Sequence, residues 1–177
     1  SSLASITIPN SVTSIEEMTF AECSSLTSII IPNSVTSIKS YAFAFSPSLS
    51  SITIPSSITS MSGDAFEGTA WFNNQPDGCV YINNNILYAY KGKMPENTHI
   101  DINEGTTMIC EVAFNSCSSL TSISIPNSVT SIGESAFSNC TGLTEIIIPN
   151  SVTTIGHSAF YNCTGLTEII IPNSVTA

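Results

Sequence analysis

Charge is the scarcest property of this chain of 177 residues. It has no arginine, three lysines and thirteen acidic residues, which gives a net charge of −10 with only 9% of residues charged. Ordinary globular proteins are about 25% charged. Nucleic-acid binding and docking on anionic membranes both need clustered cations. The sequence therefore predicts neither a nucleic-acid partner nor attachment to a membrane surface.

Long apolar runs are also missing. Runs such as residues 29–31 are only a few residues long, so no segment can span a bilayer and no direct membrane insertion is expected. The chain opens on SSLASITIPN, without the basic start or apolar stretch of a signal peptide. Because these residues fall inside a repeat, we expect that a signal and an anchor lie outside this fragment.

Isoleucine, serine and threonine are abundant, with 25, 31 and 20 copies. Hydroxyl groups therefore replace charges as the main polar groups. With 42% hydrophobic residues the chain can bury a core, which excludes a disordered chain.

The abundance of these three residues comes from an internal repeat of 23 residues. The consensus is L-T-S-I-x-I-P-N-S-V-T-S-I-G-x-x-A-F-x-x-C-x-x. The string IPNSVTSI occurs at residues 8–15, 31–38 and 125–132, with near copies that begin at Ile54, Ile148 and Ile171. Such exact spacing is typical of a repeat architecture.

Each repeat has the pattern of two short extended segments joined by a turn. L-T-S-I-x-I is rich in β-branched residues and ends at proline, which cannot donate to a strand ladder. Asn-Ser favours a turn, V-T-S-I is a second extended stretch, and Ala-Phe is expected in a tight, helical turn. A single repeat cannot bury its apolar side chains, but stacked repeats share one core. We expect parallel strands near residues 3, 26, 49, 99, 120, 143 and 166.

The pattern resembles the leucine-rich repeats of the BspA-like family of surface proteins. The stretch LTEIIIPNSVTTIGHSAFYNC at residues 143–163 and its copies carry this resemblance, which covers essentially the whole chain. It implies a leucine-rich repeat solenoid, an α/β repeat that is rich in β structure, with a curved right-handed stack and a parallel concave sheet. It also implies adhesion or protein recognition outside the cell. We expect one array over residues 1–177, with repeats at 1–66 and 100–177 and a hairpin-like aromatic insertion at about 67–99.

The insertion differs from the repeats in composition. It contains the only tryptophan, three of the five tyrosines and two of the three lysines. The segments CVYI and ILYAYK flank residues 83–85, which are all asparagine, and this arrangement predicts a β-hairpin with a three-residue loop.

Two interpretations of these aromatic residues are compatible. Aromatic side chains with polar tips are favoured anchors at interfaces, which makes four of them candidate ligand-binding residues: Trp71, Tyr81, Tyr88 and Tyr90. Alternatively, Trp71 and Phe72 fill the core where the repeats are interrupted, and the hairpin packs alongside them.

No motif predicts catalysis. The chain has no glycine-rich phosphate loop, no metal-ligand spacing and no nucleophile elbow, so we expect no catalytic residues, no cofactor and no metal site. His99 and His157 have no partner motif, and nothing in the spacing assembles a Cys-His or Ser-His-Asp set.

Four of the six cysteines occupy one repeat position, which Ser46 and Thr69 take in two other repeats; the four are Cys23, Cys117, Cys140 and Cys163. Stacking would place them about 5 Å apart with parallel side-chain directions, which favours free buried thiols over disulfides. Cys79 and Cys110 lie outside this pattern, and a bridge between them that pins the hairpin stays an open alternative.

The concave face of the sheet is the predicted binding surface. In each first strand, the second and fourth residues after leucine should point away from the core. In the later repeats this rule selects Ser122 and Ser124 and six further residues, which are the candidate ligand-binding residues: His99, Asp101, Glu145, Ile147, Glu168 and Ile170. Exposed apolar rows beside charges are typical of recognition surfaces. The alternative is that isoleucine simply follows its β propensity.

These observations predict a non-enzymatic repeat module that is secreted or on the cell surface and acts in adhesion or protein recognition. Its ligand would be a protein or a glycan. Residues 100–177 carry six acidic residues and no lysine, which favours a cationic partner for that part. The alternative function is a structural spacer or a stalk segment that self-associates end to end.

Overall fold

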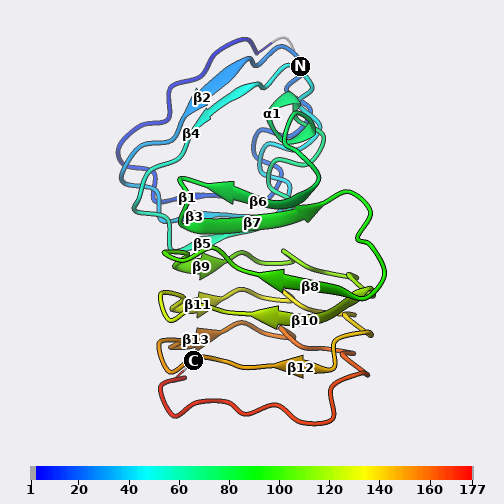
Figure 1. Ribbon diagram of the computed structural model, residues 1–177. Helices are drawn as coiled ribbons and strands as arrows, with labels where there is room; N and C mark the ends of the chain where they lie inside the picture. The colour runs from blue at the N-terminus through cyan, green and yellow to red at the C-terminus, as the bar shows by residue number, and fades with distance from the viewer. Residues whose placement is uncertain (1–2, 177) are drawn as a thin grey trace. The chain divides into compact units, whose positions relative to one another are not determined.

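The structure is a computed structural model that describes residues 3–176. The chain divides into two compact units, Ser1–Pro76 and Asp77–Ala177, and each is treated by itself (Figure 1). Both consist of short strands contributed by successive turns of the chain. Among the described residues the one helix is the four-residue α1 (Ala70–Asn73), so the fold is a β-rich repeat solenoid, as expected.

Unit 1 contains two parallel ladders. The first joins β2 (Ser28–Ile30) to β4 (Ser51–Thr53), and the second joins β1 (Ser14–Ile15), β3 (Ser37–Ile38) and β5 (Ser60–Met61). Ser28 pairs with Ser51, and Ser14 pairs with Ser37. Paired residues are therefore one repeat apart, which confirms that each repeat of 23 residues makes one turn.

Unit 2 has the same arrangement. One sheet contains β8 (Thr98–Asp101), β10 (Leu120–Ser124) and β12 (Glu145–Ile146). The other contains β6 (Gly78–Ile82), β7 (Ile86–Lys91), β9 (Met108–Ile109), β11 (Ser131–Ile132) and β13 (Thr154–Ile155). Figure 1 shows these strands at successive levels of the unit. Of the expected first strands, those near residues 3 and 166 are not strands in the structure and join no ladder.

Stacked phenylalanine rings fill the core of both units. In unit 1 the ring centroid of Phe43 lies 5.3 Å from that of Phe20 and 5.3 Å from that of Phe66. In unit 2, Phe137 lies 5.2 Å from Phe114 and 5.5 Å from Phe160. Offset stacking of this kind adds to the free energy gained by burying each ring.

The expected tight turn at Ala-Phe is present, but it is not helical. The Phe137 amide donates to the carbonyl of Ala159 in the next turn, at 2.8 Å, so its hydrogen bond runs between turns. On either side of Phe137 the backbone is left-handed, with φ of 53° at Ser135 and 60° at Asn139. Left-handed residues interrupt a helix, and they let the chain reverse direction tightly.

The cysteine position also joins successive turns. The Cys140 thiol donates to the carbonyl of Phe114 at 3.1 Å, and the Ser46 hydroxyl makes the equivalent bond to Phe20 at 3.2 Å. All six cysteines are free, Cys79 and Cys110 included, so the expectation of unbridged thiols is confirmed. Burial raises the pKa of Cys140 to about 12, which keeps its proton available for this bond at neutral pH.

The insertion divides between the two units. In unit 2, β6 and β7 form the expected antiparallel hairpin, and Ile82 pairs with Ile86 across the three-residue loop. However, β7 also pairs in parallel with β9, and the Tyr90 amide donates to the Ala113 carbonyl at 2.8 Å, as phenylalanine does elsewhere. The second strand of the hairpin is therefore a turn of the solenoid itself. It does not pack beside the array.

The Phe137 ring should contribute strongly to the stability of unit 2. We expect Phe137→Ala to lower the free energy of unfolding by about 3–5 kcal/mol, because it leaves a cavity between two stacked rings. Tyr161→Ala is the control, since Tyr161 is 65% exposed and its loss should cost no more than about 0.5 kcal/mol. Urea unfolding followed by circular dichroism measures both, and equal losses would contradict the proposed role of the ring stack.

The hydrogen bond of Cys140 makes a second prediction. Cys140→Ser keeps a donor for the Phe114 carbonyl, as Ser46 shows, whereas Cys140→Ala leaves that carbonyl with only its second hydrogen bond, from the Cys117 amide. We expect the alanine variant to be less stable than the serine variant by about 0.5–1.5 kcal/mol in the same unfolding measurement, the net contribution of one hydrogen bond. A serine variant as unstable as the alanine variant would show that the thiol acts only by filling space.

Candidate functional site

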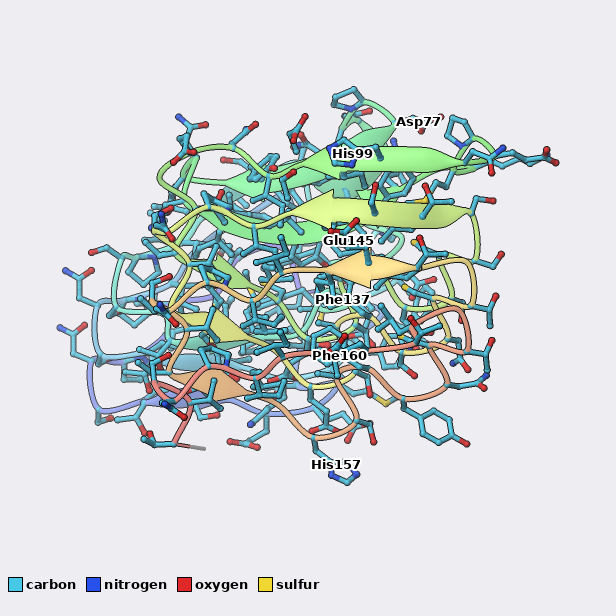
Figure 2. All side chains as sticks on the ribbon, turned by 60° about the horizontal axis from the view of Figure 1, so that its bottom comes forward. Asp77, His99, Phe137, Glu145, His157 and Phe160 are labelled. Carbon is cyan, nitrogen blue, oxygen red and sulfur yellow. The ribbon has the colours of Figure 1, made fainter. Side chains whose placement is uncertain are left out.

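The exposed side of the β8–β10–β12 sheet collects the predicted surface residues of unit 2. Ser122 on β10 pairs with His99 on β8 and with Glu145 on β12, so residues one repeat apart form columns across the strands. We call this surface, together with the exposed residues of 167–172, the acidic face. All six predicted positions on it are exposed: His99, Asp101, Glu145, Ile147, Glu168 and Ile170. Figure 2 shows His99 and Glu145 on this face and His157 well away from His99.

His99 forms the centre of a polar cluster at one end of the acidic face. Its Nδ1 lies 2.7 Å from Ser122 Oγ, and its Nε2 lies 3.1 Å from Asp101 Oδ1 and 3.4 Å from Ser124 Oγ. The hydrogen bond from Ser124, followed by that from His99, lowers the pKa of the Asp101 carboxyl below its ordinary value. The cluster therefore holds Asp101 ionised.

Sequence spacing alone did not assemble this cluster, because only the parallel register brings Ser122 beside His99. The order serine, histidine, aspartate matches that of a nucleophilic triad. However, the side chains of His99 and Asp101 are 49% and 78% exposed, on an open sheet surface. A triad needs donors for an oxyanion and shelter from water. This geometry supports a polar contact surface better than a catalytic centre.

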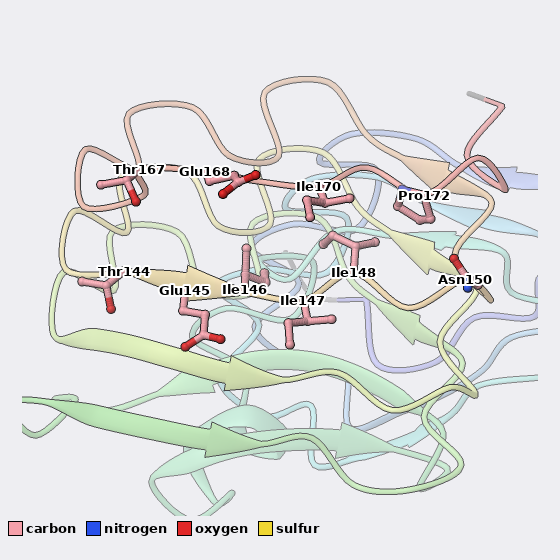
Figure 3. A pocket seen from close by; sticks show the side chains of 10 residues that line it. All are labelled: Thr144, Glu145, Ile146, Ile147, Ile148, Asn150, Thr167, Glu168, Ile170 and Pro172. Atoms are coloured by element: carbon pink, nitrogen blue, oxygen red, sulfur yellow. The ribbon is translucent and has the colours of Figure 1, made fainter.

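A groove opens at the other end of the acidic face, between residues 144–148 and residues 167–172 (Figure 3). Its volume is about 490 Å³. It is lined by Thr144, Glu145, Ile146, Ile147, Ile148, Asn150, Thr167, Glu168, Ile170 and Pro172. Four of the six predicted residues therefore come together here, while His99 and Asp101 belong to the separate polar cluster.

The groove combines apolar and acidic side chains. Ile147 and Ile170 are 71% and 72% exposed, which is unusual for large aliphatic residues on a folded surface. Glu145 and Glu168 line the same groove, and the sequence from residue 94 onward contains no lysine or arginine. The groove is therefore an apolar surface with an unneutralised negative charge.

The aromatic residues of the insertion do not form one binding surface. Tyr88 is fully buried, because β7 is a core strand of unit 2, and this corrects its assignment as a ligand contact. Tyr90 is partly buried with its ring 6.3 Å from Phe114, and the Tyr81 hydroxyl accepts a hydrogen bond from the Asn103 amide at 3.1 Å. Burial raises the pKa values of Tyr81 and Tyr90.

Trp71 lies in unit 1. The edge of its ring packs on Phe66 at a centroid distance of 5.4 Å and an interplanar angle of 67°. Trp71 is partly exposed, so it packs against a core ring without being buried in the core itself.

Sequence reasoning did not assign to the site the polar residues that complete both parts of the face. It placed Ser122 and Ser124 on the exposed face, at the same repeat positions as His99 and Asp101, but not among the candidate ligand-binding residues. Asn150 and Thr167 had no such signal, because they are ordinary repeat residues that line the groove only where the two turns separate. Within residues 3–176, no group of histidine, cysteine, aspartate or glutamate is arranged to hold a metal ion. No helix in that range is long and apolar enough to cross a bilayer.

Comparisons with known proteins agree with this architecture. The family model described as "BspA type Leucine rich repeat region" matches residues 1–89 and 80–177, with six copies. A search of curated proteins gives no match.

Solved structures of leucine-rich repeat proteins are similar to the chain. One from Bacteroides ovatus is 29% identical, with a TM-score of 0.47, over 93% of this chain and 42% of that one. A leucine-rich cell surface protein from Faecalibacterium prausnitzii is 29% identical, with a TM-score of 0.39, over 88% and 42%. The pneumococcal vaccine antigen PcpA is 22% identical, with a TM-score of 0.53, over 85% and 46%, a likeness of fold alone. The chain spans less than half the length of each of these three proteins.

The polar cluster makes a prediction about the titration of Asp101. Ser124→Ala should raise the pKa of Asp101 toward its ordinary value, because Ser124 supplies the main hydrogen bond that lowers it, and His99→Ala should do so less. Ser122→Ala is the control, since Ser122 contacts His99. Carboxyl NMR shifts across a pH titration measure the change.

The same lowered pKa makes the stability of the folded chain depend on pH. Because the pKa of Asp101 is lower in the folded state than in the unfolded state, the stabilisation by the cluster is fully present above the unfolded-state pKa. It is lost as the pH falls through the folded-state pKa. An unchanged pKa in Ser124→Ala would contradict this account.

Proposed function

Since the chain belongs to the BspA-type leucine-rich repeat family, we propose that it is a non-enzymatic recognition module that binds a macromolecule outside the cell. Repeat proteins of this kind offer extended surfaces on which one turn after another contributes contacts. The proposal treats residues 1–177 as one leucine-rich repeat array. The resemblance of the repeats to those of bacterial surface proteins supports a location on the cell surface or in the surrounding medium.

The observation that carries this proposal is the combination of exposed isoleucine and uncompensated carboxylates on the acidic face. Ile147 and Ile170 supply apolar area that a partner can cover, and Glu145 and Glu168 supply charge beside it. Apolar contact contributes most of the affinity in such interfaces, while charge selects the partner and speeds association. The partner therefore presents apolar groups together with lysine or arginine.

The polar cluster extends the same surface toward β8. Asp101 adds a third carboxylate to the face, and His99, Ser122 and Ser124 add hydrogen-bonding groups. A protein ligand can use both ends of the face at once, whereas a glycan would depend on the hydroxyl-rich end. We place a protein ligand first for this reason.

The test is binding of the 177-residue chain to a panel of immobilised extracellular matrix proteins and glycans. The double variant Glu145→Lys/Glu168→Lys should weaken binding by about tenfold or more, because it replaces attraction by repulsion. Glu134→Lys is the control, since Glu134 is exposed but lies outside the acidic face and the groove. Raised ionic strength should also weaken binding by the parent chain.

Two outcomes would count against the proposal. Equal binding by the parent chain and the double variant would remove the acidic face from the interaction. Absence of any binding, together with an increase in mass with concentration in sedimentation experiments, would favour the alternative of a self-associating spacer.

A further inference from the structure

The ladder of the β8–β10–β12 sheet does not continue to the next turn. In unit 1 the Ile31 amide donates to the Thr53 carbonyl at 3.0 Å, and in unit 2 the Ile102 amide donates to the Ser124 carbonyl at 3.1 Å. The repeat register makes Ile148 and Ile170 the corresponding pair across the groove. Among residues 3–176, the structure records no backbone hydrogen bond between 144–148 and 167–171.

The opposite side of the same two turns stays closed. The Thr176 amide donates to the Thr153 carbonyl at 3.0 Å, and the Ser174 hydroxyl donates to the Val152 carbonyl at 2.7 Å. The last turn is thus held in place on one side while the sheet side is open. The groove lies between two turns, and residues of both line it.

The opening coincides with an unfavourable cross-strand pair. Glu168 follows Glu145 by one repeat, so the register places two carboxylates in neighbouring positions of the same column. Like charges directly opposite on neighbouring strands disfavour pairing. The corresponding pairs in the closed parts of the sheets are Ser28 with Ser51 and Ser122 with His99.

The open edge leaves main-chain donors and acceptors of residues 144–148 without the partners that the register would supply. Backbone groups at a sheet edge accept a further strand readily, and an added strand places alternate side chains in the pockets on either side. The groove has about 490 Å³ of space, within the range of about 300–1,000 Å³ that ligand clefts occupy. Exposed isoleucines and two glutamates line it.

We propose that the groove binds an extended peptide segment that carries lysine or arginine. The segment adds its backbone to the free edge of β12, its apolar side chains contact Ile147 and Ile170, and its cationic side chains lie beside Glu145 and Glu168. This inference rests on the proposed recognition function and names the chemical class of its ligand and the mode of binding.

A second copy of this chain fits the groove poorly. It has no arginine and only three lysines, at positions 39, 91 and 93, and with a net charge of −10 it is repelled by the same carboxylates. A glycan offers no row of amide groups for the strand edge. A cationic extended peptide satisfies the backbone, the apolar surface and the charge together.

The test uses the 177-residue chain and a fluorescent peptide, Ac-Lys-Val-Lys-Val-Lys-Val-amide, with affinity measured by fluorescence anisotropy. We expect saturable binding by this peptide and a loss of about tenfold or more when glutamate replaces each lysine. Two further peptides, isomers of each other, carry N-methyl groups on alternate amides. In an extended strand successive amides point to opposite edges, so one isomer is methylated along one edge of the strand and the second along the opposite edge. Because N-methylation removes the donors, at least one isomer should bind about tenfold more weakly.

Substitutions in the chain locate the site. Ile170→Thr and Glu168→Gln should each weaken peptide binding severalfold, and both side chains are exposed, so the fold is preserved. Ile30→Thr is the matched control, because Ile30 has the equivalent repeat position and is 71% exposed, but lies in unit 1. Circular dichroism verifies that each variant remains folded.

The outcomes separate this inference from the broader function. Equal affinity of both N-methyl isomers and the parent peptide overturns strand addition, and equal affinity of Ile170→Thr and Ile30→Thr overturns the site. If matrix proteins bind the acidic face but the peptide does not bind the chain, the proposed function is supported and this inference is overturned. Peptide binding with the expected dependences, without matrix binding, would support the inference and count against adhesion to those matrix proteins.

Discussion

The constant register of 23 residues between turns is the constraint on which the rest of the structure depends. It aligns each strand with its own copy, so Ser14 meets Ser37 and Ser28 meets Ser51. It also stacks the phenylalanine rings at 5.2 to 5.5 Å, close to the spacing of neighbouring strands. Because strand pairing and ring stacking advance by nearly the same distance per turn, both are satisfied at once. A repeat of different length would put polar residues where the next turn needs a ring.

The same register turns small sequence differences into a surface. On an exposed strand position, any residue that departs from the consensus lies next to its counterpart one repeat away. His99 therefore meets Ser122, and Glu145 is followed in its column by Glu168. The buried positions are held nearly constant by the shared core, so variation is tolerated only on the outside. A repeat array of this type gains its specific chemistry by changing exposed residues without altering its fold.

The parts of the fold that follow the period were predictable, and the parts that break it were not. The repeated motifs placed five of the seven expected first strands, and period-two alternation separated exposed Ile147 from buried Ile146. The burial of Tyr88 was missed because the pairing of β7 with β9 is non-local and has no repeated motif. The polar cluster was predicted only in part. The sequence placed His99 and Asp101 on the exposed face, but their contacts with the serines of β10 depend on the pairing register of β8 and β10. The groove was missed because residues 143–150 and 166–173 have almost the same sequence as turns that close.

The loss of pairing at the groove coincides with two like charges that the register places in neighbouring positions. Closing the sheet there would bring Glu145 and Glu168 together and bury the surface between Ile147 and Ile170. The apolar gain favours closure, and the charge repulsion opposes it. A cationic group placed between the two carboxylates offsets this repulsion. The lining of the groove thus favours a ligand that brings positive charge, covers isoleucine and offers backbone hydrogen bonds in place of the missing strand.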